Sequence, residues 1–116
     1  MPRPEYKDHP LWVAAMELVH RAYELAQQVA AETPLIARHL RRAAVTAPSS
    51  IAEALEPAAG SSIAQSAARA RGALAEVERQ SRGVRGPHAA AARDLAAEAR
   101  RLDAQVERAF SPKTPS

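Results

Sequence analysis

The sequence predicts an all-α protein, an antiparallel up-down-up-down four-helix bundle. Three observations predict this fold: four amphipathic segments of similar length, proline or glycine between them, and no segment with the alternation typical of a strand. A chain of 116 residues suits one domain. Its apolar residues are mostly small, with 29 alanines against one Phe, one Trp and two Tyr. Each buried position therefore removes little apolar surface from water, and such a chain gains stability by burying more surface in an oligomer.

The first helix is expected to begin after Asp8, whose carboxylate can cap it, and to run to about Ala31. Pro10 fits the first turn, where a missing N–H breaks no helical hydrogen bond. Residues 1–7 are expected to be flexible, so that the bundle occupies residues 8–110.

The second helix is predicted to start at Thr33 and Pro34, an N-cap residue followed by a proline at the first helical position. It should end near Glu56, because Pro57 and Gly60 break the chain there.

The third helix is predicted to start at Ser62, which forms a capping box with Gln65. It continues to about Arg82, where the turn GVRGP separates it from a fourth helix that ends near Phe110. The tail, residues 111–116, is expected to be disordered.

Pro48 lies inside the second predicted helix and leaves two structures open. Either the helix stops near Thr46 and restarts at the capping box formed by Ser50 and Glu53, or one helix continues with a kink at the proline. A proline inside a helix costs about 3 kcal/mol unless its surroundings compensate. The hydroxyl groups of Thr46, Ser49 and Ser50 are suited to bond the backbone groups that the proline frees.

The first predicted helix carries two adjacent apolar stripes, whereas a surface helix of a monomer usually needs one. The second stripe either faces another subunit or lies deep in its own bundle, and we expect a subunit interface. The first stripe is Leu11, Ala15, Leu18, Ala22, Leu25 and Val29. The second runs from Trp12 to Ala30, and its candidate interface residues are Trp12, Met16, Val19 and Tyr23. The seam of the third helix is Ile63, Ala67, Ala70, Leu74, Val77, Ser81 and Val84.

Positive charge is concentrated in the middle of the chain. Residues 35–86 hold eight Arg and four Glu, net +4, whereas the rest of the chain is net −1, which gives the overall +3. The chain has no cysteine, no apolar segment of the signal-peptide kind and no apolar run long enough to span a membrane. These features predict a cytoplasmic protein without a membrane partner.

The second helix needs counter-charges, because Arg38 and Arg42 lie one turn apart and repel each other. We expect Arg42 to pair with Glu53 or Glu76 in a partly shielded polar cluster. Carboxylates of a neighbouring subunit and nucleic-acid phosphates are the alternatives.

The third helix and the turn after it hold five Arg against two Glu, so some arginines should remain unpaired. The candidates for phosphate binding are Arg71, Arg79, Arg82 and Arg85. The plain alternative is a solvated charged face that binds nothing.

Residues typical of catalysis or ligand binding are scattered. The four histidines lack the spacing of a metal-binding helix, the four glycines form no phosphate-binding loop, and the serines cluster at helix caps. We therefore predict no enzymatic activity, no cofactor, no metal site and no small-molecule substrate.

The run LRRAAVTAPSSIAEAL, with a Trp near the start of the first helix and GALAEVERQ in the third, resembles a family of small bacterial four-helix-bundle proteins. That family includes proteins encoded in intervening sequences of 23S rRNA genes and the Avd-like accessory proteins of diversity-generating retroelements. The matching positions are Arg41 to Ala44, Pro48, Ser49, Ile51, Ala52, Glu53, Gly72, Leu74, Glu76 and Gln80. Ser50 stands where the family usually has Asn, Ala54 stands where it usually has Gly, and alanines replace the family's aromatic residues in the third helix.

The resemblance implies one long second helix that passes through Pro48 and an assembly of five subunits. It also implies a non-enzymatic scaffold that binds a protein partner, such as a nucleic-acid-processing protein, or nucleic acid itself, through basic surface patches. The alternative is a purely structural, self-assembling protein without affinity for nucleic acid.

Overall fold

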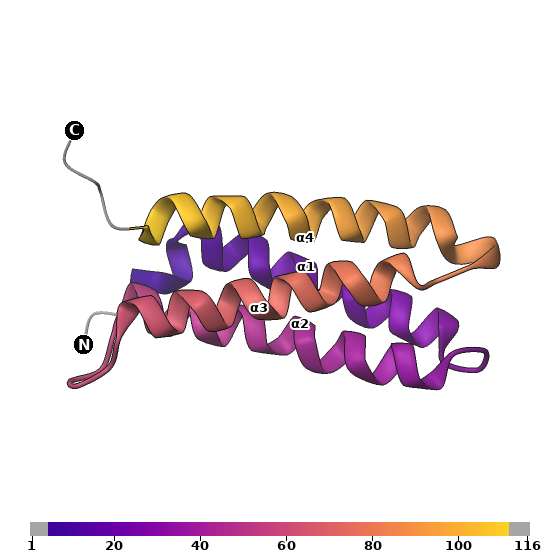
Figure 1. The fold of residues 1–116 in the computed structure, drawn as a ribbon, viewed down its shortest axis with the longest axis horizontal. Coiled ribbons are helices and arrows are strands. Elements are labelled where there is room, and N and C mark those ends of the chain that lie inside the picture. The colour runs from indigo at the N-terminus through magenta and orange to yellow at the C-terminus, as the bar shows by residue number, and fades with distance from the viewer. Residues whose placement is uncertain (1–4, 112–116) are drawn as a thin grey trace.

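The computed structural model describes residues 5–111, and these residues form four α-helices and two short 3-10 helices, without a strand. The elements are η1 (Glu5–Asp8), α1 (Pro10–Val29), α2 (Pro34–Leu55), α3 (Ile63–Arg82), η2 (Gly86–His88) and α4 (Ala89–Phe110). The four α-helices lie side by side along the long axis of the molecule (Figure 1). Helix α2 packs between α1 and α3, and α4 packs against α3 and, less extensively, against α1. The predicted all-α fold of four bundled helices is confirmed.

The N-terminal segment is helical as far as the structure describes it. Residues 1–4 and 112–116 lie outside the described residues. The predicted flexible segment, residues 1–7, includes the first of these ranges, and the predicted disordered tail, residues 111–116, includes the second. Residues 5–7 belong to η1, where the Tyr6 ring meets the Trp12 ring edge-on with centroids 5.6 Å apart. The Tyr6 N–H also donates to the Glu56 carboxylate at 2.9 Å. Residues 5–7 thus take a regular conformation in contact with α1 and α2, and flexibility of the N-terminal segment stays a prediction.

The cap of α1 is His9, not Asp8. The His9 N–H closes η1 by donating to the Tyr6 carbonyl at 3.0 Å, which leaves Asp8 inside η1 and places His9 in an extended conformation before Pro10. The Nδ1 atom of His9 then accepts the Leu11 N–H at 3.1 Å. A capping prediction from Asp8 missed the short helix in front of it.

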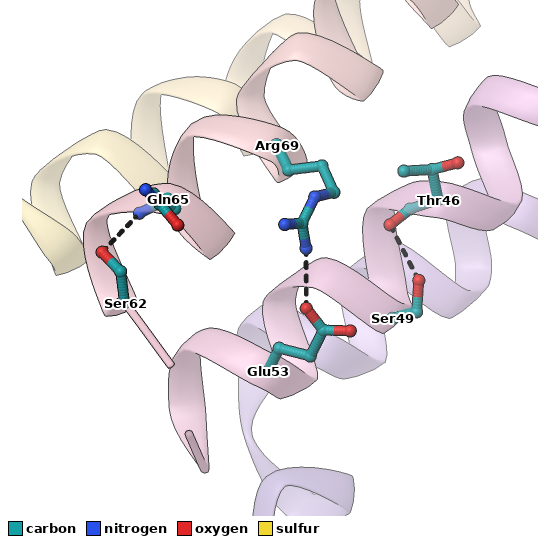
Figure 2. A network of polar contacts seen from close by, with 6 residues as sticks. All are labelled: Thr46, Ser49, Glu53, Ser62, Gln65 and Arg69. Atoms are coloured by element: carbon teal, nitrogen blue, oxygen red, sulfur yellow. Dashed lines mark hydrogen bonds and ion pairs between the residues drawn. The ribbon is translucent and has the colours of Figure 1, made fainter. Parts of the chain in front are cut away.

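The other predicted starts agree with the structure. Helix α2 begins at Pro34 after Thr33, although the Thr33 hydroxyl donates back to the Val29 carbonyl at 3.1 Å and caps nothing in α2. Helix α3 begins after Ser62, whose hydroxyl accepts the Gln65 N–H at 3.1 Å (Figure 2). The breaks at Gly60 and Gly86 both have positive φ, +81° and +79°, which glycine adopts without a steric penalty.

Helix α2 is continuous through the buried Pro48, so the alternative of two separate helices is excluded. Two of the three hydroxyl groups named near the proline bond backbone carbonyls. Thr46 donates to the Arg42 carbonyl at 3.0 Å, and Ser49 donates to the Thr46 carbonyl at 3.1 Å (Figure 2). Neither bond reaches the Ala44 carbonyl, which is the group that Pro48 frees, so the predicted compensation is not seen in these bonds.

The core is built mainly from alanine, because 14 of its 26 buried hydrophobic residues are Ala. The first stripe of α1 is buried along its whole length, and the α3 seam is buried except at its first residue, Ile63, which is 44% exposed. The seven buried leucines and five buried Val or Ile residues therefore supply most of the apolar area in the interior. Within the described residues, no helix is long and apolar enough to cross a membrane.

Candidate functional site

Arg71 of α3 is held by two carboxylates of α4. Its Nε lies 2.7 Å from Asp103 Oδ1, and its Nη1 lies 3.0 Å from Glu107 Oε2. The hydrogen bond to Asp103 raises the pKa of Arg71 above its ordinary value; desolvation opposes this shift, and attraction to both carboxylates adds to it. Arg71 therefore ties α3 to α4 and is not an uncommitted cation.

Two more of the predicted phosphate-binding arginines are paired on their own helix. Arg79 lies 3.2 Å from the Glu76 carboxylate, and Arg82 lies 2.7 Å from the Glu78 carboxylate. Arg85 is the one member of the predicted group that makes no ion pair within residues 5–111, and its side chain is exposed. The expectation of unpaired arginines is therefore wrong for Arg71, Arg79 and Arg82, and phosphate binding at Arg85 stays a prediction.

The predicted pairing of Arg42 is also wrong for the part of the chain that the structure describes. Glu53 instead pairs with Arg69 across the α2–α3 boundary at 2.7 Å (Figure 2), and Glu76 pairs with Arg79. Glu53 follows Arg42 by three helical turns, about 16 Å along the axis, which places it out of reach. The expected polar cluster is thus replaced by separate pairs, and Arg42 keeps no carboxylate partner among the described residues.

Three arginines of α2 form what we call the arginine face: Arg38, Arg41 and Arg42. None of them makes an ion pair within the described residues, and Arg38 and Arg42 are exposed whereas Arg41 is half-buried. The spacings of three and four bring them to one side of the helix. The arginine face is the main group of cations on α2 and α3 that lacks internal counter-charges.

The arginine face lines a surface hollow of about 420 Å³ together with Tyr23, Val45 and Thr46. Tyr23 comes from α1 and is 44% exposed, and Val45 is 46% exposed. An aromatic ring, an aliphatic side chain and three guanidinium groups therefore meet at the boundary of α1 and α2. No carboxylate of the described residues lines this hollow.

A groove of about 430 Å³ between α2 and α3 adjoins this hollow and shares Arg42 and Thr46 with it. Its floor includes Ala43 and Ala73, whose small side chains leave room between the two helices. The remaining lining residues are His39, Arg69 and Glu76. The hollow and the groove thus lie on either side of Arg42 and Thr46, and together we call them the depression around Arg42.

The predicted interface residues of α1 differ in exposure. Trp12, Met16 and Val19 are half-buried, and Trp12 and Val19 pack against the core of their own subunit. Of these four residues only Tyr23 is exposed, and it borders the arginine face. The second stripe is therefore partly covered within the bundle, and a subunit interface there stays a prediction.

Helix α4 carries a second basic face that the sequence analysis missed. Three of its four acidic residues reach the neighbouring helices, where Asp103 and Glu107 bind Arg71 of α3 and Glu98 binds Arg21 of α1; the fourth, Asp94, is exposed. Four arginines remain exposed without an ion pair among the described residues: Arg93, Arg100, Arg101 and Arg108. Their spacings of seven and eight residues place them on one side of the helix, because each residue turns the helix by about 100°. This spacing could have been found in the sequence, but the net charge summed over a segment does not show it.

Among the described residues, no three His, Asp or Glu side chains gather in a way that could hold a metal ion. The chain matches no protein-family model, and no curated protein or solved structure is significantly similar to it. The resemblance to the bacterial four-helix-bundle family therefore rests on the matching residues alone.

Proposed function

We propose that this protein is a non-enzymatic, cytoplasmic scaffold of up-down-up-down antiparallel bundles, assembled as a homopentamer, that binds nucleic acid through a basic surface. A protein that acts on nucleic acid would be recruited by the same assembly. The observation that carries the proposal is the arginine face, which lines a depression and lacks internal counter-charges in the described structure.

The physical reason is electrostatic. The guanidinium groups of Arg38 and Arg42 are one turn apart on α2 and repel each other, and neither has a carboxylate partner among the described residues. An external anion would relieve this repulsion. Guanidinium groups suit phosphate because their planar donors can bind two oxygen atoms at once.

Assembly would strengthen weak contacts. A closed ring repeats the arginine face once per subunit, so a polyanion long enough to reach several copies would gain affinity by avidity. Three modest cation sites per subunit could support useful binding in this way.

A purely structural role is the second candidate. The internal pairing of Arg71, Arg79 and Arg82 favours it, because those side chains already have carboxylate partners. A titration with nucleic acid separates the two candidates.

Assembly is the first expectation to test. Analytical ultracentrifugation should show a species of about 62 kDa, five times the 12.4 kDa subunit. Met16→Glu should dissociate it, because the substitution places an unpaired charge in the half-buried second stripe. Val13→Glu is the control, since Val13 lies beside that stripe on α1 and is 40% exposed. A 12.4 kDa monomer at all concentrations would contradict the pentamer.

Phosphate binding is the second expectation. A labelled nucleic acid should bind the intact assembly with an affinity that falls steeply as salt increases. Changing Arg38, Arg41 and Arg42 together to Gln should weaken binding and make the salt dependence shallower. The matched control changes Arg93, Arg100 and Arg101 of α4 to Gln, which removes the same charge from another exposed face and should have the smaller effect. Negligible binding by the unmodified protein at low salt would leave only the structural role.

A further inference from the structure

Tyr23 is an exposed aromatic residue with unusual surroundings. A single exposed tyrosine is ordinary on a protein surface. This ring, however, lines the same hollow as Arg38, Arg41 and Arg42, and no ring contact covers it within residues 5–111. The only aromatic pair of the described residues is Tyr6 with Trp12, near the other end of α1.

The lining of the hollow has two parts of different chemistry. Its guanidinium groups favour an anion, and the absence of a carboxylate among its described lining residues leaves that preference uncompensated. Its Tyr23 ring and Val45 side chain favour a flat apolar surface. A nucleotide carries both parts, a phosphate and a base with an exposed π-face.

Duplex and single-stranded nucleic acids differ in what they offer this ring. Bases in a duplex stack on one another and present only their edges in the grooves, whereas unpaired bases can stack on an aromatic side chain. Phosphate contacts alone would serve either form equally. An aromatic ring among the arginines therefore favours the single strand.

The depression is long enough for more than one nucleotide. Its α2 side extends from Arg38 to Thr46, about 12 Å along the helix axis. Beyond Arg42 and Thr46 the groove adds the His39 ring, which contacts the Gln80 amide at 3.5 Å, and Arg69 and Glu76, which are paired with Glu53 and Arg79. A strand that leaves the hollow would thus meet a planar ring and charges that are already paired, so the binding preference rests on the hollow itself.

We infer that the depression around Arg42 binds single-stranded nucleic acid, with a base stacked on Tyr23 and the adjacent phosphates held by Arg38, Arg41 and Arg42. This inference rests on the proposed function and deepens it by naming the class of nucleic acid. It assigns Tyr23 to ligand binding, in place of the subunit interface expected from the sequence.

Fluorescence anisotropy on the full-length assembly tests the inference. The probes are a labelled single-stranded pyrimidine oligonucleotide, an abasic strand of the same length and a duplex of the same length. Tyr23→Leu keeps apolar bulk and removes the ring, and Tyr23→Phe keeps the ring. Sedimentation of each variant reports whether the assembly is intact.

Tyr23→Leu is expected to weaken binding of the single strand about tenfold, within the range measured for the loss of one stacked base. Tyr23→Phe should bind like the unmodified protein, and neither change should alter binding of the duplex or the abasic strand. The Arg38, Arg41 and Arg42 variant should reduce the salt slope for the single strand by about 2, since each phosphate contributes about 0.7.

Equal binding of the single strand by Tyr23→Leu and the unmodified protein would overturn the inference and leave the proposed function standing. Dissociation of the assembly by Tyr23→Leu would do the same, because it would return Tyr23 to the subunit interface. Binding of polyglutamate as tight as that of the single strand would also overturn the inference, because the hollow would then be a general anion site. Failure of the unmodified protein to bind any nucleic acid at low salt would refute the proposed function itself.

Discussion

Replacing Leu74 with Ala is expected to lower the free energy of unfolding by about 2 to 5 kcal/mol. Leu74 is fully buried in α3, and it is one of the few large side chains in a core made mainly of alanine. Its removal leaves a cavity that neighbouring alanines cannot fill, since they have no rotamers with which to adjust. Because domains are typically stable by about 5 to 15 kcal/mol, the change is a large share of the total.

Urea denaturation followed by circular dichroism measures this effect, with Ile63→Ala as the control. Ile63 belongs to the same apolar seam in the sequence but is 44% exposed at the start of α3. Its truncation should alter stability by no more than about 0.5 kcal/mol. Equal losses at both positions would show that the interior is not packed as described.

Enlarging a buried alanine should also be costly, for the opposite reason. Ala70 is fully buried on α3, which packs against both α2 and α4. Ala70→Leu inserts three carbon atoms where helices approach over small side chains, and it should destabilise the bundle by about 1 to 3 kcal/mol. Thermal and urea denaturation both report the change.

Ala75→Leu is the matched control for Ala70→Leu, because Ala75 is exposed on the same helix. Leu and Ala differ little in helix propensity, so the control should be close to neutral. A neutral Ala70→Leu would mean that α3 lies farther from its neighbours than an alanine interface requires.

The helices could be predicted because their signals are local. Thr33 with Pro34, Ser62 with Gln65, and the glycine breaks act through the backbone within a few residues, so the chain segment alone contains the information. The cap of α1 shows the limit of such local signals. Glu5–Asp8 form a 3-10 helix, so the residue before α1 is His9 and not Asp8. Pro48 was ambiguous for the same reason, since its neighbours support either a restart or a continuous helix.

The candidate site could be predicted only in part, because ion pairs depend on how each helix is rotated against its neighbours. Sequence counting found the excess of arginine in the middle of the chain but did not foresee that Arg71, Arg79 and Arg82 have carboxylate partners. Arg71 meets Asp103 only because α3 packs beside α4, and Arg69 meets Glu53 only because α3 packs beside α2. Which arginines have no carboxylate partner can therefore be seen only when the packing of the helices is known.

The order in which the bundle forms follows from which helices touch. Packing is most extensive between helices that follow one another in the chain, and it is sparsest between α1 and α4, where Arg21 and Glu98 bridge the first and last helices. Contacts of short sequence separation cost little loop-closure entropy, which favours rapid folding. Helices α2 and α3 pack most extensively against each other, and each has a further helix beside it, so we expect this pair to form first. Hydrogen exchange should then be slowest in α2 and α3, which would place the arginine face on one of the most stable helices.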